Sequence, residues 1–321
     1  MERTRRGGRK PQADAILDEI ALSSNKTKFL AAAAQYPIDR HDSWDHYIKK
    51  VTGWVDYAAR RGAKLAVFPE YGAMELASLN ADTMGDLNAS LEQVSALAPH
   101  VDALHIELAR EHDMHILAAS MPVYREGRYR NVARLFTPSG TMGSQEKLVM
   151  TRFEREQWKV HAGGPLRLFE TELGRIGVLI CYDSEFPLLG RALVEAGAEI
   201  ILVPSCTDTV AGYNRVKIGA MARALEGQCY VIHAPTVGEA GWSPAVDVNH
   251  GIAGIYCPPD RGFPETGIAA IGELDAKQWV LGEIDVSRVA DVRKDGSVLN
   301  FAHWPEQPGA AQLPEVELIA L

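Results

Sequence analysis

The sequence predicts an α/β fold, and three observations support this prediction. Short apolar runs, typical of buried strands, alternate with longer segments whose apolar residues recur at helical spacing. Continuous apolar strands of this kind lie in sheets that helices cover on both faces. No internal repeat and no Pro-, Gly- or Ser-rich linker divides the 321 residues. We therefore expect one large domain built on a helix-covered sheet.

The predicted domain begins with an alanine-rich apolar strand at 29–36. A helix is predicted at 44–61, because apolar residues recur there every three or four positions. The next apolar run, 65–68, is a strand that ends at Pro69, since proline cannot donate to a sheet ladder. These elements form the first strand–helix–strand unit.

A longer helical pattern follows at 87–112, with a break expected near Pro99 because proline disrupts a helix interior. Arg175 to Ile180 is a strongly apolar strand, and Pro187 marks the start of the helix after it. Short apolar runs and helical spacing predict the remaining elements in the same way. They are strands at 115–121 and 132–136, a helix at 187–195, a strand at 200–203, a helix at 215–225, and strands at 230–234 and 268–271.

Two terminal segments differ from the domain, which we expect to span 28–303. Residues 1–27 are predicted to be an N-terminal arm, because five of the first ten are Arg or Lys and no apolar export signal follows. Its amphipathic stretch at 14–22 would either dock on a partner subunit or remain a loose solvated tail. Residues 304–321, rich in Pro, Gln and Glu, are predicted to be a C-terminal arm.

Composition excludes several classes of protein. The net charge is −9, whereas a general nucleic-acid binder carries an excess of basic residues. No apolar run approaches the roughly 18 residues that a membrane span requires. Four widely spaced cysteines form neither a zinc pattern nor a disulfide framework, so we expect reduced thiols and a cytoplasmic location. His112 and His115 lack further ligands and no Walker A loop or GxGxxG motif is present, so no metal and no cofactor are predicted.

Three segments place reactive side chains beside strand ends. Glu70 follows the strand at 65–68, where ligand sites of α/β sheets lie, and a carboxylate there can transfer protons. Lys147 sits in a charged cluster, partly shielded by the apolar residues after it. Cys181 lies at a strand-to-helix elbow. Considered singly, the alternatives are a solvated loop carboxylate, a surface lysine and a small buried hydrophobic residue.

Cys181 has the best setting for a nucleophile among the four cysteines. An elbow exposes its thiol, and a helix N-terminus after it should lower the thiol pKa and direct N–H groups at an oxyanion. Cys206, which also follows a strand, is the competing candidate. Cys229 and Cys257 are expected to be ordinary buried thiols.

Taken together, the three segments resemble the nitrilase, or carbon–nitrogen hydrolase, superfamily. The resemblance rests on Phe68-Pro-Glu70, on Lys147 followed seven residues later by Glu154, and on Ile180-Cys181-Tyr-Asp183. It covers roughly 28–285, and three motifs in the right order make it specific. The resemblance implies a four-layer α-β-β-α sandwich that pairs through helices into a homodimer or a larger homo-oligomer.

The resemblance also implies roles for residues. Cys181 would be the nucleophile, Glu70 the general base, and Lys147 the stabiliser of the transition state. Glu154 would be a second, supporting carboxylate, with Glu156 as the alternative because the local spacing is loose. We further expect substrate contacts from the loops around the site, with aromatic packing as the alternative role of the rings; the residues are Tyr71, Trp158, Tyr182 and Thr207.

These roles predict hydrolysis of a small linear amide through a cysteine thioester, releasing ammonia or an amine and a carboxylic acid. Cys181-Tyr-Asp183 resembles the amidase members of the family, whereas true nitrilases more often have Cys-Trp-Glu there. The alternatives are a nitrilase acting on a C≡N bond, an acyltransferase passing the thioester to an amine, and a catalytically silent interaction protein on the same fold. The expected partners are a small amide and a second copy of the chain, with no nucleic acid and no membrane.

Overall fold

The computed structural model describes residues 28–311 and 314–321, so the predicted arm at 1–27, with its amphipathic stretch, lies outside the described residues. The strands are β1 (Lys28–Pro37), β2 (Ala63–Val67), β3 (His115–Arg125), β4 (Arg128–Phe136), β5 (Met142–Glu146), β6 (Leu166–Thr171), β7 (Gly174–Val178), β8 (Ile200–Ser205), β9 (Tyr230–Glu239), β10 (Val248–Asn249), β11 (Gly254–Tyr256), β12 (Ile268–Ile271), β13 (Gln278–Asp285) and β14 (Val316–Ala320). The α-helices are α2 (Trp44–Arg60), α3 (Leu87–Ala96), α4 (Ala98–Glu111), α5 (Pro187–Glu195), α6 (Val210–Gly227), α7 (Ser287–Asp295) and α8 (Asn300–His303). Short 3-10 or π segments are η1 (Gly72–Leu79), η2 (Glu154–Trp158), η3 (Cys181–Glu185) and η4 (Trp304–Glu306).

The strands form two halves that meet at one junction. The main hydrogen-bonded order is β14-β6-β7-β8-β9-β1-β2-β3-β4-β5. At the junction, β1 and β9 pair only through Tyr36 with Thr236 and Pro37 with Val237. Because the two central strands pair only near their carboxyl ends, the halves separate elsewhere and face each other as two sheets.

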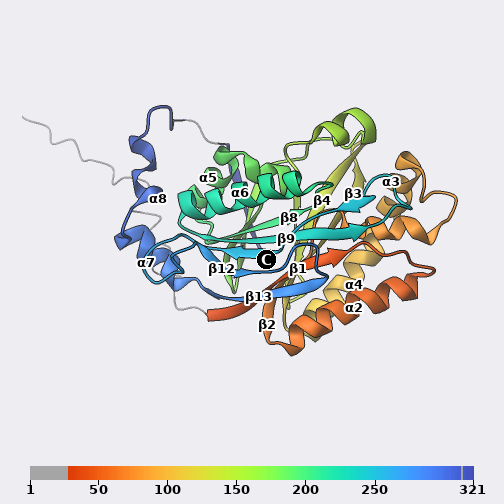
Figure 1. The fold of residues 1–321 in the computed structure, drawn as a ribbon, viewed down its shortest axis with the longest axis horizontal. Coiled ribbons are helices and arrows are strands. Elements are labelled where there is room, and N and C mark those ends of the chain that lie inside the picture. Colours follow the sequence, from red (N-terminus) through yellow and green to blue (C-terminus); the bar gives the residue numbers. More distant parts are fainter. Residues whose placement is uncertain (1–27, 312–313) are drawn as a thin grey trace, which may run out of the picture.

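Helices cover the outer face of each half, which gives four layers (Figure 1). Residues 31–37 of β1 are all buried, and successive side chains pack on opposite faces, as the strand period of two requires. Ala31 and Ala33 join one core cluster with strands of the other half, whereas Ala32 and Ala34 join a second cluster with α2 and α4. Small residues on both faces therefore let β1 lie between a helix layer and the opposite sheet. The predicted α/β fold is confirmed.

The helical pattern at 87–112 is split as expected, although the boundary lies slightly earlier than Pro99. α3 ends at Ala96 and α4 begins at Ala98, which places Pro99 in the first turn of α4. Proline is tolerated there because the first N–H groups of a helix have no acceptor within the helix. α6 begins before the predicted 215, because the Oγ1 of Thr209 caps it by accepting from the N–H of Gly212.

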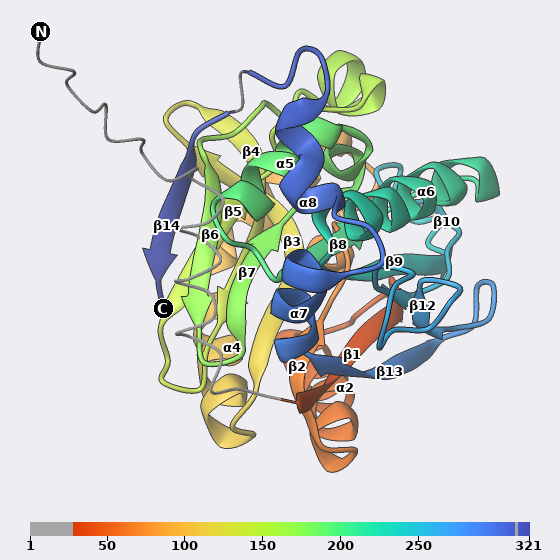
Figure 2. The same cartoon turned by 90° about the vertical axis from the view of Figure 1, so that its left-hand side faces the viewer.

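The C-terminal segment contributes a strand to the edge of one half. β14 pairs in parallel with β6, from Val316 with Leu166 to Ala320 with Glu170. Figure 2 shows β14 beside β6 and away from the junction of the halves. The segment predicted as a C-terminal arm thus extends the sheet of the domain.

Parallel strands bring the candidate residues to one edge of the molecule. β1, β2 and β3 run parallel, and so do β7, β8 and β9. β1 and β9 are also parallel at the junction. The carboxyl ends of β2, β7 and β8 consequently open onto the same region, where an α/β sheet places its ligand sites.

Candidate active site

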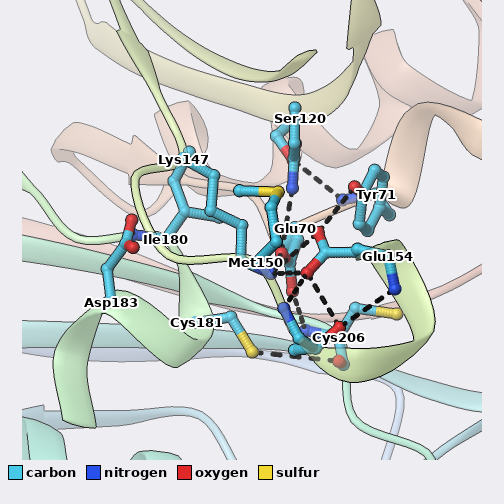
Figure 3. A network of polar contacts seen from close by, with 12 residues as sticks. Glu70, Tyr71, Ser120, Lys147, Met150, Glu154, Ile180, Cys181, Asp183 and Cys206 are labelled. Atoms are coloured by element: carbon cyan, nitrogen blue, oxygen red, sulfur yellow. Dashed lines mark hydrogen bonds and ion pairs between the residues drawn. The ribbon is translucent and has the colours of Figure 1, made fainter. Parts of the chain in front are cut away.

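The structure brings Glu70, Lys147, Glu154 and Cys181 into one polar network (Figure 3). Glu70 follows β2, Lys147 follows β5, Glu154 opens η2, and Cys181 opens η3 after β7. The four side chains thus come from four separate segments of the chain. The site exists only after both sheets have formed.

Glu70 is buried and surrounded by hydrogen-bond donors. Its Oε1 accepts from the Nζ of Lys147 at 2.7 Å and from the Nδ2 of Asn131 at 2.9 Å. Its Oε2 accepts from the backbone N–H of Cys206 at 3.0 Å. Burial raises the pKa of Glu70, and the positive charge of Lys147 opposes that rise. The result is a carboxylate held in one orientation and poised to gain a proton.

A buried chain of side chains supports Glu70 from the neighbouring sheet. The hydroxyl of Ser120 donates to the Oδ1 of Asn131 at 2.6 Å and accepts from the N–H of Tyr71 at 3.0 Å. Ser120 lies in the irregular stretch of β3 where its register against β4 shifts, between Ala118 and Met121. Such bulges redirect side chains beside functional sites. Sequence reasoning did not find Ser120, because a lone serine within an apolar strand carries no signal of a bulge.

Lys147 is almost fully buried, yet it is charged. Its Nζ contacts the two oxygens of Glu154 at 2.9 and 2.8 Å in addition to Glu70. Burial alone would lower the pKa of Lys147, but the two carboxylates raise it well above its ordinary value. The ammonium is therefore a fixed positive charge within the site.

Glu154 differs from Glu70 in the net direction of its pKa shift, which is downward. Beyond Lys147, it accepts from the N–H and the Oγ1 of Thr151, both at 2.8 Å, and from the hydroxyl of Tyr71 at 2.8 Å. Burial pushes the pKa of Glu154 up, but Lys147 and the hydrogen bonds leave it lowered. Glu156, the alternative carboxylate, pairs instead with Arg152 at the surface. The geometry selects Glu154 as the second carboxylate beside Lys147.

Cys181 occupies a sharp elbow between β7 and η3. Its φ of +50° lies in the left-handed region, a strained conformation for a residue with a side chain. The hydroxyl of Ser184 donates to the carbonyl of Cys181 at 2.7 Å, and Arg223 donates to the carbonyl of Ser184 at 2.9 Å. These bonds, made from η3 and α6, fix the direction of the thiol.

The expected lowering of the Cys181 pKa is wrong. Burial raises the pKa of the thiol well above its ordinary value, and the negative charge of Glu70 adds to the rise, while Lys147 opposes it. The residue is only 4% exposed, so water does little to stabilise a thiolate. The resting sulfur consequently keeps its proton, and Glu70 is the adjacent group that can remove it.

The second thiol near the site is turned away from Glu70. The Sγ of Cys206 donates to the Oδ1 of Asn249 at 3.2 Å. Only the backbone of Cys206 faces the network, where its carbonyl lies 3.9 Å from the Sγ of Cys181. Burial raises the pKa of Cys206 to about 12. Cys206 therefore contributes main-chain atoms to the network rather than its sulfur.

The four residues expected to contact substrate take different positions. The hydroxyl of Tyr71 binds Glu154, and its ring packs on the buried ring of Trp158 at a centroid distance of 4.6 Å. Thr207 donates its Oγ1 to the carbonyl of His250 at 2.8 Å. The half-buried ring of Tyr182 packs edge-on against Phe186. Tyr71 and Trp158 thus support the carboxylate side of the network.

The described residues offer no metal site and no membrane-spanning helix. Residues 28–311 and 314–321 contain no group of three or more His, Cys, Asp or Glu side chains arranged to hold a metal ion. His112 is used in a contact with Asp56 at 2.9 Å. Across the same ranges, no helix combines the length and apolar character needed to cross a bilayer.

The chain is similar to several known proteins. The sequence profile of the carbon–nitrogen hydrolase family matches residues 30–294. The probable hydrolase YhcX of Bacillus subtilis strain 168 is 33% identical over 264 residues, covering 82% of this chain and 51% of the relative. This chain therefore spans about half the length of that relative. The deaminated glutathione amidase of Synechocystis is 29% identical over 217 residues, covering 64% of this chain and 76% of the relative.

A solved structure shares the fold. A mutant of the amidase from Nesterenkonia sp. AN1, which carries acrylamide added at its active-site cysteine, superposes with a TM-score of 0.64 at 19% identity. The match covers 83% of this chain and 97% of that one. With the family profile spanning most of the described domain, the chain belongs to the carbon–nitrogen hydrolase family, within the nitrilase superfamily.

Proposed function

We propose that the protein hydrolyses a non-peptide C–N bond of a small linear amide through a thioester on Cys181. The observation that carries the proposal is the shared contact of one buried ammonium with two carboxylates. Lys147 binds Glu70 and Glu154, and Glu70 in turn adjoins the Cys181 thiol. A nucleophile, a proton acceptor and a positive charge lie within one network, as acyl transfer requires.

In the first half of the reaction, Glu70 takes the proton from the Sγ of Cys181 as the sulfur attacks the amide carbon. The carbonyl oxygen becomes an oxyanion, which the Nζ of Lys147 and the backbone N–H of Tyr182 stabilise. Tyr182 is the second residue of η3, so its N–H has no acceptor within that helix. When the C–N bond breaks, Glu70 returns its proton to the leaving amine and a thioester remains.

In the second half, Glu70 takes a proton from water while the water oxygen attacks the thioester. The C–S bond then breaks, the carboxylic acid leaves, and the proton on Glu70 returns to the sulfur. Glu70 is therefore used twice as a base and twice as an acid. Its raised pKa suits a group that must both accept and release a proton.

The two carboxylates divide the work because their surroundings differ. Glu70 has a raised pKa and exchanges protons, whereas Glu154 has a lowered pKa and remains a fixed negative charge. Glu154 thereby orients Lys147 and keeps its ammonium protonated. In our proposal, Glu154 is a positioning residue rather than a proton carrier.

An amide rather than a nitrile is the proposed substrate. Support comes from the Cys181-Tyr-Asp183 motif and from the relatives, one named as a deaminated glutathione amidase and one as an amidase with an adduct at its active-site cysteine. The thioester is proposed for the same reason, since acylation of a thiol is the step that this arrangement favours.

The experiment compares hydrolysis of small amides and of matched nitriles by the wild type, Cys181→Ala and Cys257→Ala. Cys257 is a buried thiol outside the network, so its variant controls for loss of a cysteine. We expect ammonia or amine release from amides, lowered by on the order of 10³-fold or more only in Cys181→Ala. Turnover of nitriles alone would make the protein a nitrilase, and turnover of neither would favour an interaction protein.

We also propose that the chain forms a homodimer or a larger homo-oligomer through α5 and α6. The outward face of α6 carries exposed apolar side chains at helical spacing, with Ile218 67% exposed between Val210 and Leu225, and Leu188 of α5 is exposed nearby. Light scattering at micromolar concentration tests this, and a particle of 35 kDa alone would contradict it. The cytoplasmic location remains a prediction from the cysteine pattern, which cell fractionation would test.

A further inference from the structure

Asp183 is fully buried between the two segments that carry Lys147 and Cys181. Its Oδ1 accepts from the N–H of Val149 at 2.8 Å and of Leu148 at 3.2 Å. Its Oδ2 accepts from the N–H of Ile180 at 3.2 Å. One carboxylate therefore holds the backbone just after Lys147 and the backbone just before Cys181. Figure 3 shows Asp183 beside Ile180.

The backbone around Lys147 depends on this contact once it leaves β5. The N–H of Lys147 donates to the carbonyl of Asn131 at 2.9 Å, and its carbonyl accepts from the N–H of Gly163 at 2.8 Å. The next two N–H groups, of Leu148 and Val149, no longer face a strand and donate to Asp183. Beyond the end of β5, the direction of this segment is set by the Asp183 carboxylate.

The elbow on the other side is fixed by the same residue. The N–H of Asp183 donates to the carbonyl of Ile180 at 3.0 Å while its side chain accepts from the N–H of Ile180. This closed turn spans Cys181, whose φ of +50° persists only if its surroundings enforce it. Asp183 thus constrains the backbone next to Lys147 and the backbone next to Cys181.

Building on the proposed function, we propose that Asp183 is a positioning residue that sets the separation between the Lys147 ammonium and the Cys181 sulfur. The physical reason is that a misplacement of about 1 Å can cost on the order of 10²-fold in rate. Asp183 touches neither the substrate nor the reacting atoms. It acts through the two backbones that it joins.

The test replaces Asp183 with asparagine, which has the same shape. Every partner of the side chain in this contact is an N–H donor, so the new NH₂ group must face one of them and lose that link. Burial raises the pKa of Asp183 to about 7, while Lys147 and the N–H donors oppose the rise, so measurements at pH 8 keep the wild-type carboxylate ionised.

We expect kcat per active site to fall by about 10- to 100-fold in Asp183→Asn, with KM within about threefold. Alkylation of Cys181 by iodoacetamide should also slow by several-fold, because Lys147 no longer supports the thiolate as well. Asp183→Glu keeps the carboxylate, although its extra methylene strains a buried site, and should recover most of the alkylation rate. Asp183→Glu also provides a test of the position if the asparagine variant fails to fold.

The matched control is Glu199→Gln. Glu199 is another buried carboxyl group that accepts a backbone N–H, from Arg175 at 2.9 Å, but it lies at the opposite end of β7 and β8. Its variant should leave the kcat and the alkylation rate unchanged. The inference would be overturned if Asp183→Asn kept the wild-type kcat and alkylation rate. It would also be overturned if Asp183→Asn and Asp183→Glu lost equal amounts of both. Because alkylation needs no amide turnover, it tests Asp183 even if the proposed function fails.

Discussion

The neighbouring strands β7 and β8 each end close to a cysteine, and the two thiols face different surroundings. After β7, the elbow directs Cys181 toward Glu70 and Lys147. After β8, the chain directs the Sγ of Cys206 to Asn249, and only its backbone N–H reaches Glu70. A strand end followed by a cysteine is thus no sufficient signal of a nucleophile. The backbone conformation at the elbow decides which sulfur meets the base.

Among these variants, Glu70→Gln is expected to lose the most activity. Glu70 adjoins the thiol of Cys181 but not that of Cys206, so this variant tests whether the base decides between the two thiols. Without a proton acceptor, kcat/KM should fall by about 10³-fold. In the wild type, kcat/KM should fall as the pH drops through the raised pKa of Glu70, since protonated Glu70 cannot take the thiol proton. The part of that acid limb that Glu70 contributes should disappear in the variant. A loss below tenfold would remove Glu70 from the mechanism.

A smaller loss, on the order of 10- to 100-fold, is expected from Glu154→Gln, which removes the fixed charge behind Lys147. The negative charge of Glu154 raises the pKa of Glu70, so its removal should move the acid limb of the pH–rate profile to lower pH. Glu156→Gln is the matched control, because Glu156 pairs with Arg152 at the surface. A limb that stays in place, or moves upward, would contradict the separate roles of the two carboxylates.

The smallest effect is expected from Cys206→Ala. Alanine keeps the backbone N–H that binds Glu70 and removes the contacts of the sulfur, including the one with Asn249. We expect kcat/KM to fall by no more than about fivefold, with the free energy of unfolding lowered by about 1 kcal/mol through the lost hydrogen bond. Steady-state kinetics and thermal denaturation measure the two quantities. A loss of kcat/KM as large as that in Cys181→Ala would mean that both thiols take part in the chemistry.

Much of the fold could be predicted because its signals are local. The continuous apolar run of β1 and the helical spacing of α2 are each visible in a few consecutive residues. Strand ends also marked the approximate positions of Glu70 and Cys181. The family resemblance then supplied Lys147 and Glu154, whose own surroundings in the sequence are ambiguous.

The supporting network could not be predicted, because it depends on contacts between distant segments. Asn131 reaches Glu70 from β4, and Ser120 joins it only because β3 shifts its register there. The pKa of Cys181 was mispredicted for a related reason. A helix N-terminus is visible in the sequence, whereas the burial that raises the pKa arises from packing of the whole domain.

The most direct test of a thioester on Cys181 is mass spectrometry of the protein quenched with acid during turnover of a small amide. Trypsin should release Cys181 within peptide 176–191 and Cys206 within peptide 192–215, so the two thiols are separable. We expect an added acyl mass on peptide 176–191 that disappears once substrate is exhausted. An acyl group on peptide 192–215, or continued hydrolysis with neither peptide ever acylated under conditions that trap a thioester, would contradict it.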